Sequence, residues 1–182
     1  SEYSQDQIEK ELQLLGANFE TLDYDDLINK TSENLSKEKA IGWFQGRMEF
    51  GPRALGARSI LGDPRSDKMQ KTLNLKVKYR ESFRPFAPSI LQEDLLNWFD
   101  LNVESPYMLL VANVNRDKQI EMTDEQIKLF GIDKLNIKRS KIPAVTHVDY
   151  SARIQTVKTD TNKRYYDLIS KFKEKTGCPV IV

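Results

Sequence analysis

The spacing of hydrophobic residues predicts helices in the first forty residues. Apolar positions three or four apart indicate a helix over 4–16, and Ser4 with Gln7 forms a possible capping box at its start. The same periodicity predicts a second helix over 24–36. We interpret residues 1–39 as a helical N-terminal edge or linker and 40–182 as the main domain.

Short apolar runs bounded by glycine, proline or aspartate predict extended segments after residue 40. The expected extended segments are 40–46, 59–63, 83–91, 107–114, 142–149, 152–157 and 179–182. We predict that the run 40–46 is a buried strand. Pro85 and Pro88 keep 83–91 out of a helix.

Further helices are expected between these strands. Ser66 can cap one that ends near Lys76, another covers 92–99, and the sequence TDEQ from Thr123 is a second capping box. Asn162 is expected to cap a final helix that ends at Gly177, with one apolar face formed by Tyr165, Leu168, Ile169 and Phe172. Because helices and strands interleave, we predict an α/β (α+β) fold with a twisted mixed β-sheet and flanking helices.

Composition indicates an ordinary globular domain with 182 residues, 39% hydrophobic and 30% charged. No run approaches the roughly 18 apolar residues needed to cross a membrane, and the polar N-terminus does not resemble a signal peptide. The single cysteine, Cys178, cannot form an internal disulfide and is expected in the core. We therefore expect a cytoplasmic protein with no membrane partner. One cysteine and one histidine disfavour a closed zinc site.

Charge suggests a local anion site instead of a basic surface. The net charge of +1 gives no global positive field, which disfavours nucleic acid as a partner. Between residues 47 and 65, however, four arginines accompany several glycines, which let a backbone approach a ligand closely. Arg53 and Arg58 are the candidate binding residues here. The alternative is that these arginines pair with Glu49 and Asp63 in plain turns.

The stretch KVKYRESFR supplies four more cations: Lys76, Lys78, Arg80 and Arg84. If the chain is extended after Leu75, the first three project to one face. Cations gathered in this way need an anion or carboxylates when partly buried, and arginine forks match phosphate oxygens. The alternative is a solvated basic edge strand.

The third candidate segment, HVDYSARIQ, contains His147, Asp149, Arg153 and Gln155. On a strand, His147 and Asp149 would share a face, and so would Arg153 and Gln155. Asp149 could hold Mg²⁺ or orient an amide, and His147 could act as an acid or base, or be structural. Arg153 and Gln155 suit an anion and a planar carbonyl or amide.

Four long motifs, taken together and in order, resemble the C-terminal domain of the carbamoyltransferase family. They are GRMEFGPRALGARSILGDPR, LNLKVKYRESFRPFAPSIL, IPAVTHVDYSARIQTV and TGCPVIV. The family includes the nodulation-factor, tobramycin and cephalosporin O-carbamoyltransferases, and the resemblance covers about 40–182. It implies a YrdC-like fold, similar to threonylcarbamoyl-AMP synthase.

The resemblance also implies an enzyme that binds carbamoyl phosphate and ATP, with Mg²⁺, and forms carbamoyl adenylate. The carbamoyl group would then pass to a hydroxyl of a sugar or natural product. The partner would be an N-terminal Kae1-like domain of the same chain, which carries a further, iron-type metal. No metal ligands are expected in this fragment itself, Asp149 excepted.

The site implied by the resemblance combines the three basic segments. Lys78, Arg84 and Arg153 would be catalytic, and the residues expected to bind substrate or nucleotide are Arg53, Arg58, Lys76, Arg80, His147, Asp149 and Gln155. In the family an NTSFN-type motif follows the last strand, whereas this sequence ends at Val182. We therefore expect a truncated domain without full activity. Two alternatives stay open: a nucleic-acid-binding module, and a structural domain that docks on the N-terminal domain, with the arginines making interdomain ion pairs.

Overall fold

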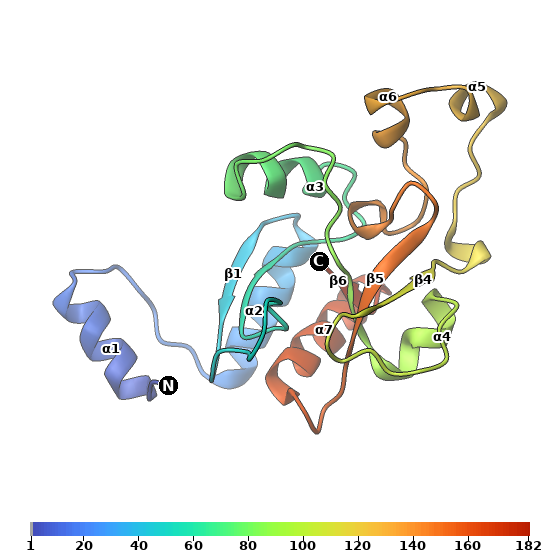
Figure 1. Cartoon of the computed structure of the whole chain (residues 1–182). Helices are drawn as coiled ribbons and strands as arrows, with labels where there is room; N and C mark the ends of the chain where they lie inside the picture. The colour runs from blue at the N-terminus through green and yellow to red at the C-terminus, as the bar shows by residue number, and fades with distance from the viewer. Residues whose placement is uncertain (1) are drawn as a thin grey trace.

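The computed structural model describes residues 2–182 and contains two β-sheets with helices around them (Figure 1). The strands are β1 (Ile41–Phe44), β2 (Arg58–Leu61), β3 (Ser89–Leu91), β4 (Leu110–Asn113), β5 (Ser151–Val157) and β6 (Val180–Ile181). The larger sheet has the order β4-β5-β3-β6, and β1 pairs with β2 in a two-stranded sheet. β3 runs parallel to β5, whereas the other pairs are antiparallel. The prediction of a mixed sheet with flanking helices is confirmed.

Helix α7 (Lys163–Thr176) packs against the larger sheet and against α2 (Tyr24–Ser36). The Asn162 side chain accepts from the Tyr165 N–H at the start of α7, and Gly177 ends it in the left-handed conformation with φ 73°. The face formed by Tyr165, Leu168, Ile169 and Phe172 is buried. Both ends and the apolar face are as the sequence predicted.

Helix α1 (Gln5–Leu14) has the expected capping box between Ser4 and Gln7. None of its residues is buried, and in Figure 1 it lies to one side of the molecule, away from both sheets. Its formation therefore reflects local sequence signals, and its apolar positions do not contribute to the core.

The remaining helices are short and lie between the strands. They are α3 (Met69–Thr72), η1 (Leu73–Val77), η2 (Gln92–Asp94), α4 (Leu95–Trp98), η3 (Arg116–Lys118), α5 (Asp124–Ile127), α6 (Ile132–Leu135) and η4 (Pro143–Val145). The capping box at Thr123 is present, and the helical segment expected over 92–99 is confirmed. No helix of the described chain combines the length and apolar character that crossing a bilayer requires.

One predicted strand, and the extended arrangement considered after Leu75, are absent from the described part of the chain. The chain stays helical through Leu73–Val77, in a wide π-turn closed by a bond of 2.9 Å from the Lys78 N–H to the Leu73 carbonyl, so Lys76, Lys78 and Arg80 do not alternate along a strand. The segment 142–149 is not a strand, because Pro143 opens the short helix η4 and turns follow it.

Two smaller expectations also need correction. The first strand is only partly buried, since Trp43 is its one buried residue. The helix expected to start at Ser66 begins instead at Met69, and the Ser66 hydroxyl accepts from the Lys68 N–H just before it.

Candidate functional site

The cationic cavity, as we name it here, has a volume of about 370 Å³ and lies where the three basic segments of the sequence meet. Its cationic lining residues are Arg53, Arg58, Lys78, Arg80 and Arg153. None of the described residues that line it is acidic. Phe86, Met108 and Tyr165 add apolar surface. A cavity of this size and composition can accept a small anion attached to an apolar group.

Arg53 lies close enough to Arg153 to lower its pKa. Burial lowers the pKa of Arg153, and the positive charge of Arg53 lowers it further. The Nε atom of each is buried and has no hydrogen-bond partner among the described residues. Two uncompensated guanidinium groups in one cavity repel each other, so an anion bound between them would stabilise both.

Arg58 has a different role from Arg53 and Arg153. Its guanidinium donates to the carbonyls of Gln45 at 2.9 Å, Ala57 at 2.7 Å and Gly46 at 3.1 Å, and it lies 3.5 Å from the centroid of the Phe44 ring. Since three of its hydrogen bonds go to backbone carbonyls, Arg58 mainly holds the loop that carries Arg53.

The loop between β1 and β2 is built around Glu49. Its carboxylate accepts from the N–H groups of Leu55 at 2.8 Å and Ala57 at 2.7 Å. Burial alone would raise the pKa of Glu49, but these backbone hydrogen bonds outweigh it and the pKa lies below its usual value. Glu49 therefore shapes the loop and does not pair with its arginines.

A chain of buried hydrogen bonds joins α7, β3, β5 and this loop, and two of its members, Tyr165 and Ser89, also line the cavity. The Tyr165 hydroxyl donates to Ser89 Oγ, which donates to Gln155 Oε1, and Gln155 Nε2 donates to the Leu55 carbonyl, each at 2.9 Å. Gln155 shares a face of β5 with Arg153, as the sequence predicted. Both ends of its amide are engaged, however, so the structure places Gln155 as a support below the cavity and not in its lining.

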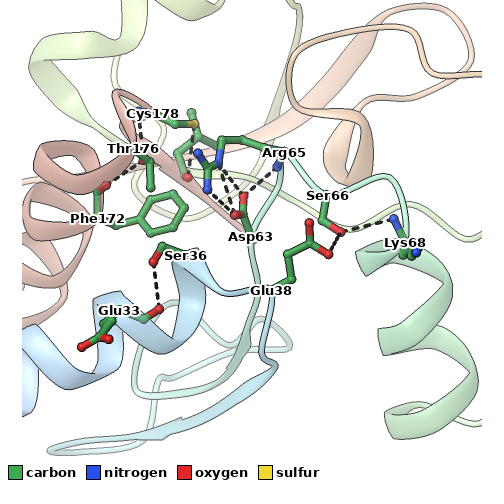
Figure 2. Close-up of polar contacts among 11 residues, drawn as sticks. Glu33, Ser36, Glu38, Asp63, Arg65, Ser66, Lys68, Phe172, Thr176 and Cys178 are labelled. Atoms are coloured by element: carbon green, nitrogen blue, oxygen red, sulfur yellow. Dashed lines mark hydrogen bonds and ion pairs between the residues drawn. The ribbon is translucent and has the colours of Figure 1, made fainter.

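Arg65 differs from the cavity arginines because its charge is neutralised. It pairs with the buried Asp63 through Nε at 2.9 Å and through a terminal nitrogen at 2.6 Å (Figure 2). The hydrogen bond with Asp63 raises the pKa of Arg65. Cys178 lies beside this pair in Figure 2, and burial raises the pKa of its thiol to about 12, which makes it a core residue, as expected.

The structure does not bring every candidate residue to the cationic cavity. Lys76 is exposed and is not part of the cavity lining, and Arg84 is exposed and lies 3.9 Å from Glu81. The expected alignment of Lys76 with Lys78 and Arg80 depended on an extended chain, which the helical turn replaces. The structure therefore offers Arg84 no contact with the cavity.

His147 and Asp149 lie in a separate cavity of about 340 Å³, which Phe83, Arg139 and Val148 also line. They sit in a turn, not on a shared strand face, and both contact Ser151: His147 Nδ1 at 3.0 Å and Asp149 Oδ1 at 2.7 Å. Burial lowers the pKa of His147, whereas the hydrogen bonds from Ser151 lower that of Asp149.

Asp149 does not stand in a metal-binding cluster. Within residues 2–182 no group of three or more histidine, cysteine, aspartate or glutamate side chains is arranged to hold a metal ion. Magnesium is usually held by one or two carboxylates together with waters and phosphate oxygens, so Mg²⁺ binding at Asp149 stays a prediction.

Sequence reasoning missed Asn74, which is fully buried and accepts from Arg80 Nε at 2.6 Å. A polar residue in the apolar run TLNLKV was the available signal, since buried amides are hydrogen-bonded. Its partners could not be inferred, because they lie across a turn that the sequence did not predict.

Comparison with known proteins identifies the family. A family model described as "Carbamoyltransferase C-terminus" matches residues 32–182. The chain is 58% identical over 158 residues to an uncharacterized protein of Synechocystis sp., covering 87% of this chain and 26% of that protein. It is 40% identical over 161 residues to nodulation protein NolO of Bradyrhizobium diazoefficiens, covering 87% of this chain and 26% of that protein.

A third relative carries an enzyme name. The chain is 36% identical over 160 residues to a 3'-hydroxymethylcephem-O-carbamoyltransferase of Amycolatopsis lactamdurans, covering 88% of this chain and 26% of that protein. The chain thus spans about a quarter of the length of these curated relatives. Together with the match over 32–182, these similarities show that the chain belongs to the carbamoyltransferase family, as its C-terminal domain.

Proposed function

We propose that this domain binds carbamoyl phosphate and ATP in the cationic cavity and forms carbamoyl adenylate. The carbamoyl group would then pass to a hydroxyl of a sugar or natural product. The observation that carries the proposal is the cavity itself, which gathers Arg53, Lys78, Arg80 and Arg153 and has no acidic side chain among its described lining residues. Such a site needs an anion to be stable, and the named relatives include an O-carbamoyltransferase.

In this reaction water first cleaves carbamoyl phosphate to carbamate and inorganic phosphate. A carbamate oxygen then attacks the α-phosphorus of ATP, a new P–O bond forms, and the bond to pyrophosphate breaks. ATP supplies the adenylyl group and the leaving group. The work of the protein is then to position the phosphates and neutralise charge, and no protein nucleophile is required. Arg80, Arg153 and Lys78 would contact phosphate oxygens, while Phe86 offers an apolar wall to the remainder of the nucleotide.

The wider organisation is part of the same proposal. The domain would have a YrdC-like fold and work with an N-terminal Kae1-like domain that carries an iron-type metal and completes the transfer. We also propose a cytoplasmic location. The length of the relatives supports a second domain, because this chain accounts for about a quarter of each.

Calorimetric titration of Mg-ATP into this chain, with and without carbamoyl phosphate, tests the proposal. We expect saturable binding that Arg153→Gln and Lys78→Ala both weaken. For Arg153, which is partly buried, removing one partner of a desolvated charge pair costs on the order of 2–5 kcal/mol. The matched control is Arg116→Gln, which removes an exposed arginine that lies in neither cavity. Affinities within twofold of the unmodified chain for both cavity variants would refute the assignment.

A further inference from the structure

We infer that Asn74 is a positioning residue that fixes the guanidinium of Arg80 for anion binding, an inference that rests on the proposed function of the cationic cavity. Asn74 has 0% exposure and lies outside the cavity lining, so it cannot touch a ligand there. Its influence on binding must act through the residues it holds.

The Asn74 amide contacts three different parts of the segment that follows it. Its Nδ2 atom donates to the carbonyls of Ser82 at 3.0 Å and Arg84 at 2.8 Å, and its Oδ1 accepts from Arg80 Nε at 2.6 Å. The Asn74 backbone carbonyl also accepts from the Arg80 N–H at 3.0 Å. Asn74 thus holds Arg80 at both its backbone and its side chain.

The wide turn of η1 makes this arrangement possible. The helix closes with the bond from the Lys78 N–H to the Leu73 carbonyl, and Tyr79 then adopts a positive φ of 49°. This conformation reverses the chain, so that Arg80 returns to the helix it has just left. Positive φ is costly for a residue with a side chain and is found mostly where surrounding contacts enforce it.

The hydrogen bond to Asn74 leaves the ligand-binding end of Arg80 free. Nε–H is used internally, whereas the two terminal nitrogens have no hydrogen-bond partner among the described residues. The Phe86 ring, whose centroid lies 5.0 Å from the Arg80 guanidinium carbon, restrains the same group from another side. A guanidinium held in advance loses less side-chain entropy when it binds an anion.

Asparagine satisfies all of these contacts at position 74. Aspartate could accept from Arg80 but could not donate to the two carbonyls, and its charge would neutralise the guanidinium. Leucine or alanine would leave the carbonyls and Arg80 Nε without their partner. The residue is therefore specified by the position of Arg80 as well as by burial.

A double-mutant cycle separates positioning from general structural support. Pyrophosphate affinity is measured by calorimetry for the unmodified chain, Asn74→Ala, Arg80→Ala and the double variant. We expect each single change to weaken binding by about five- to fiftyfold, and the double variant to bind as Arg80→Ala does. Additive losses of affinity would overturn the role of Asn74 but not the cavity assignment. Unchanged affinity in Arg80→Ala would overturn the cavity assignment as well.

Gln70→Ala is the matched control. Gln70 lies on the same helix and donates to the Phe83 carbonyl at 2.9 Å, so it supports the same segment without contacting Arg80. We expect its pyrophosphate affinity to stay within twofold of that of the unmodified chain, and a loss equal to that of Asn74→Ala would contradict the inference. If Asn74→Ala does not fold, Asn74→Asp replaces it. A loss of pyrophosphate affinity from Asn74→Asp that is absent when Arg80 is already alanine supports the inference. An equal loss of affinity with and without Arg80 refutes it.

Discussion

Gly56 lies so close to Tyr165 that a Cβ atom at position 56 would stand 2.6 Å from the Tyr165 ring. The contact packs the loop that carries Arg53 directly onto α7, and the Tyr165 hydroxyl continues into the hydrogen-bond chain through Ser89. The position also has φ +102°, which residues with a side chain rarely adopt. One glycine thus joins the cavity wall to the core of the domain.

We expect Gly56→Ala to destabilise the domain by about 2–4 kcal/mol, because it adds both a clash with the ring and backbone strain. Urea unfolding measures the loss. Gly51→Ala is the control: it lies in the same loop at φ +139°, with no atom within 4 Å of a Cβ, so it introduces strain without the clash. Equal losses in both variants would contradict the packing explanation.

Arg65→Met should destabilise the fold without affecting ligand binding. It leaves the Asp63 carboxylate, which is 1% exposed, without its charge partner. Breaking a buried pair on one side costs about 3–5 kcal/mol, and the partial exposure of Arg65 places the expected loss near 3 kcal/mol. Chemical denaturation checks the stability, and titration with pyrophosphate should give an unchanged affinity. A large loss of affinity in a folded variant would mean that Arg65 belongs to the site.

Glu49 should make the stability of the domain depend on pH. Its pKa is lower in the folded chain than the unfolded value of about 4.3, so its ionised form stabilises the fold above that pH and the contribution is lost on acidification. Glu49→Gln should therefore be less stable than the unmodified chain at about pH 7, and the difference should shrink towards about pH 3. Urea unfolding at several pH values measures it. A difference independent of pH would show that the charge of Glu49 is not what matters.

His147 should titrate below the ordinary histidine pKa of about 6.5, because burial disfavours its charged form. It is the single histidine of the chain, so its imidazole proton signal in a nuclear magnetic resonance titration is unambiguous. Unfolding the chain in urea should raise the pKa of His147 to the ordinary histidine value. A folded value at or above the unfolded one would place His147 in a more exposed position than the structure does.

Local signals allowed much of the fold to be predicted from the sequence. The capping boxes at Ser4 and Thr123, and the cap and stop of α7 at Asn162 and Gly177, each depend on residues within one helical turn. Such signals act on the nearby backbone whatever the tertiary structure is. The helices α1, α5 and α7 could therefore be placed before their packing was known.

The wrong secondary-structure expectations arose where a sequence pattern was compatible with both a strand and a helix. Alternating cations at 76, 78 and 80 suggested a strand, but the helix begun at Met69 continues, because its buried residues Leu73 and Asn74 pack inside. The apolar run after Ile142 also suggested a strand, yet Pro143 suits the start of a helix equally well. Periodicity over a few residues does not separate these cases.

The candidate site was predictable in composition and less so in geometry. Arginines from distant segments do meet in one cavity, and Arg53 and Arg153 are the clearest pair. The positions of Arg84, His147 and Gln155 relative to that cavity depended on turns and on partners far away in sequence. Gln155, for example, bonds to Leu55, a contact between segments that no local pattern relates.

The most direct test of the central claim is a crystal structure of this chain grown with pyrophosphate. We expect the anion in the cationic cavity, with oxygens hydrogen-bonded to the guanidinium groups of Arg80 and Arg153 and close to Lys78. Arg80 should keep its bond to Asn74 when the anion is bound. Pyrophosphate bound only elsewhere, for example beside His147, or a cavity left without the anion at saturating concentration, would contradict the account.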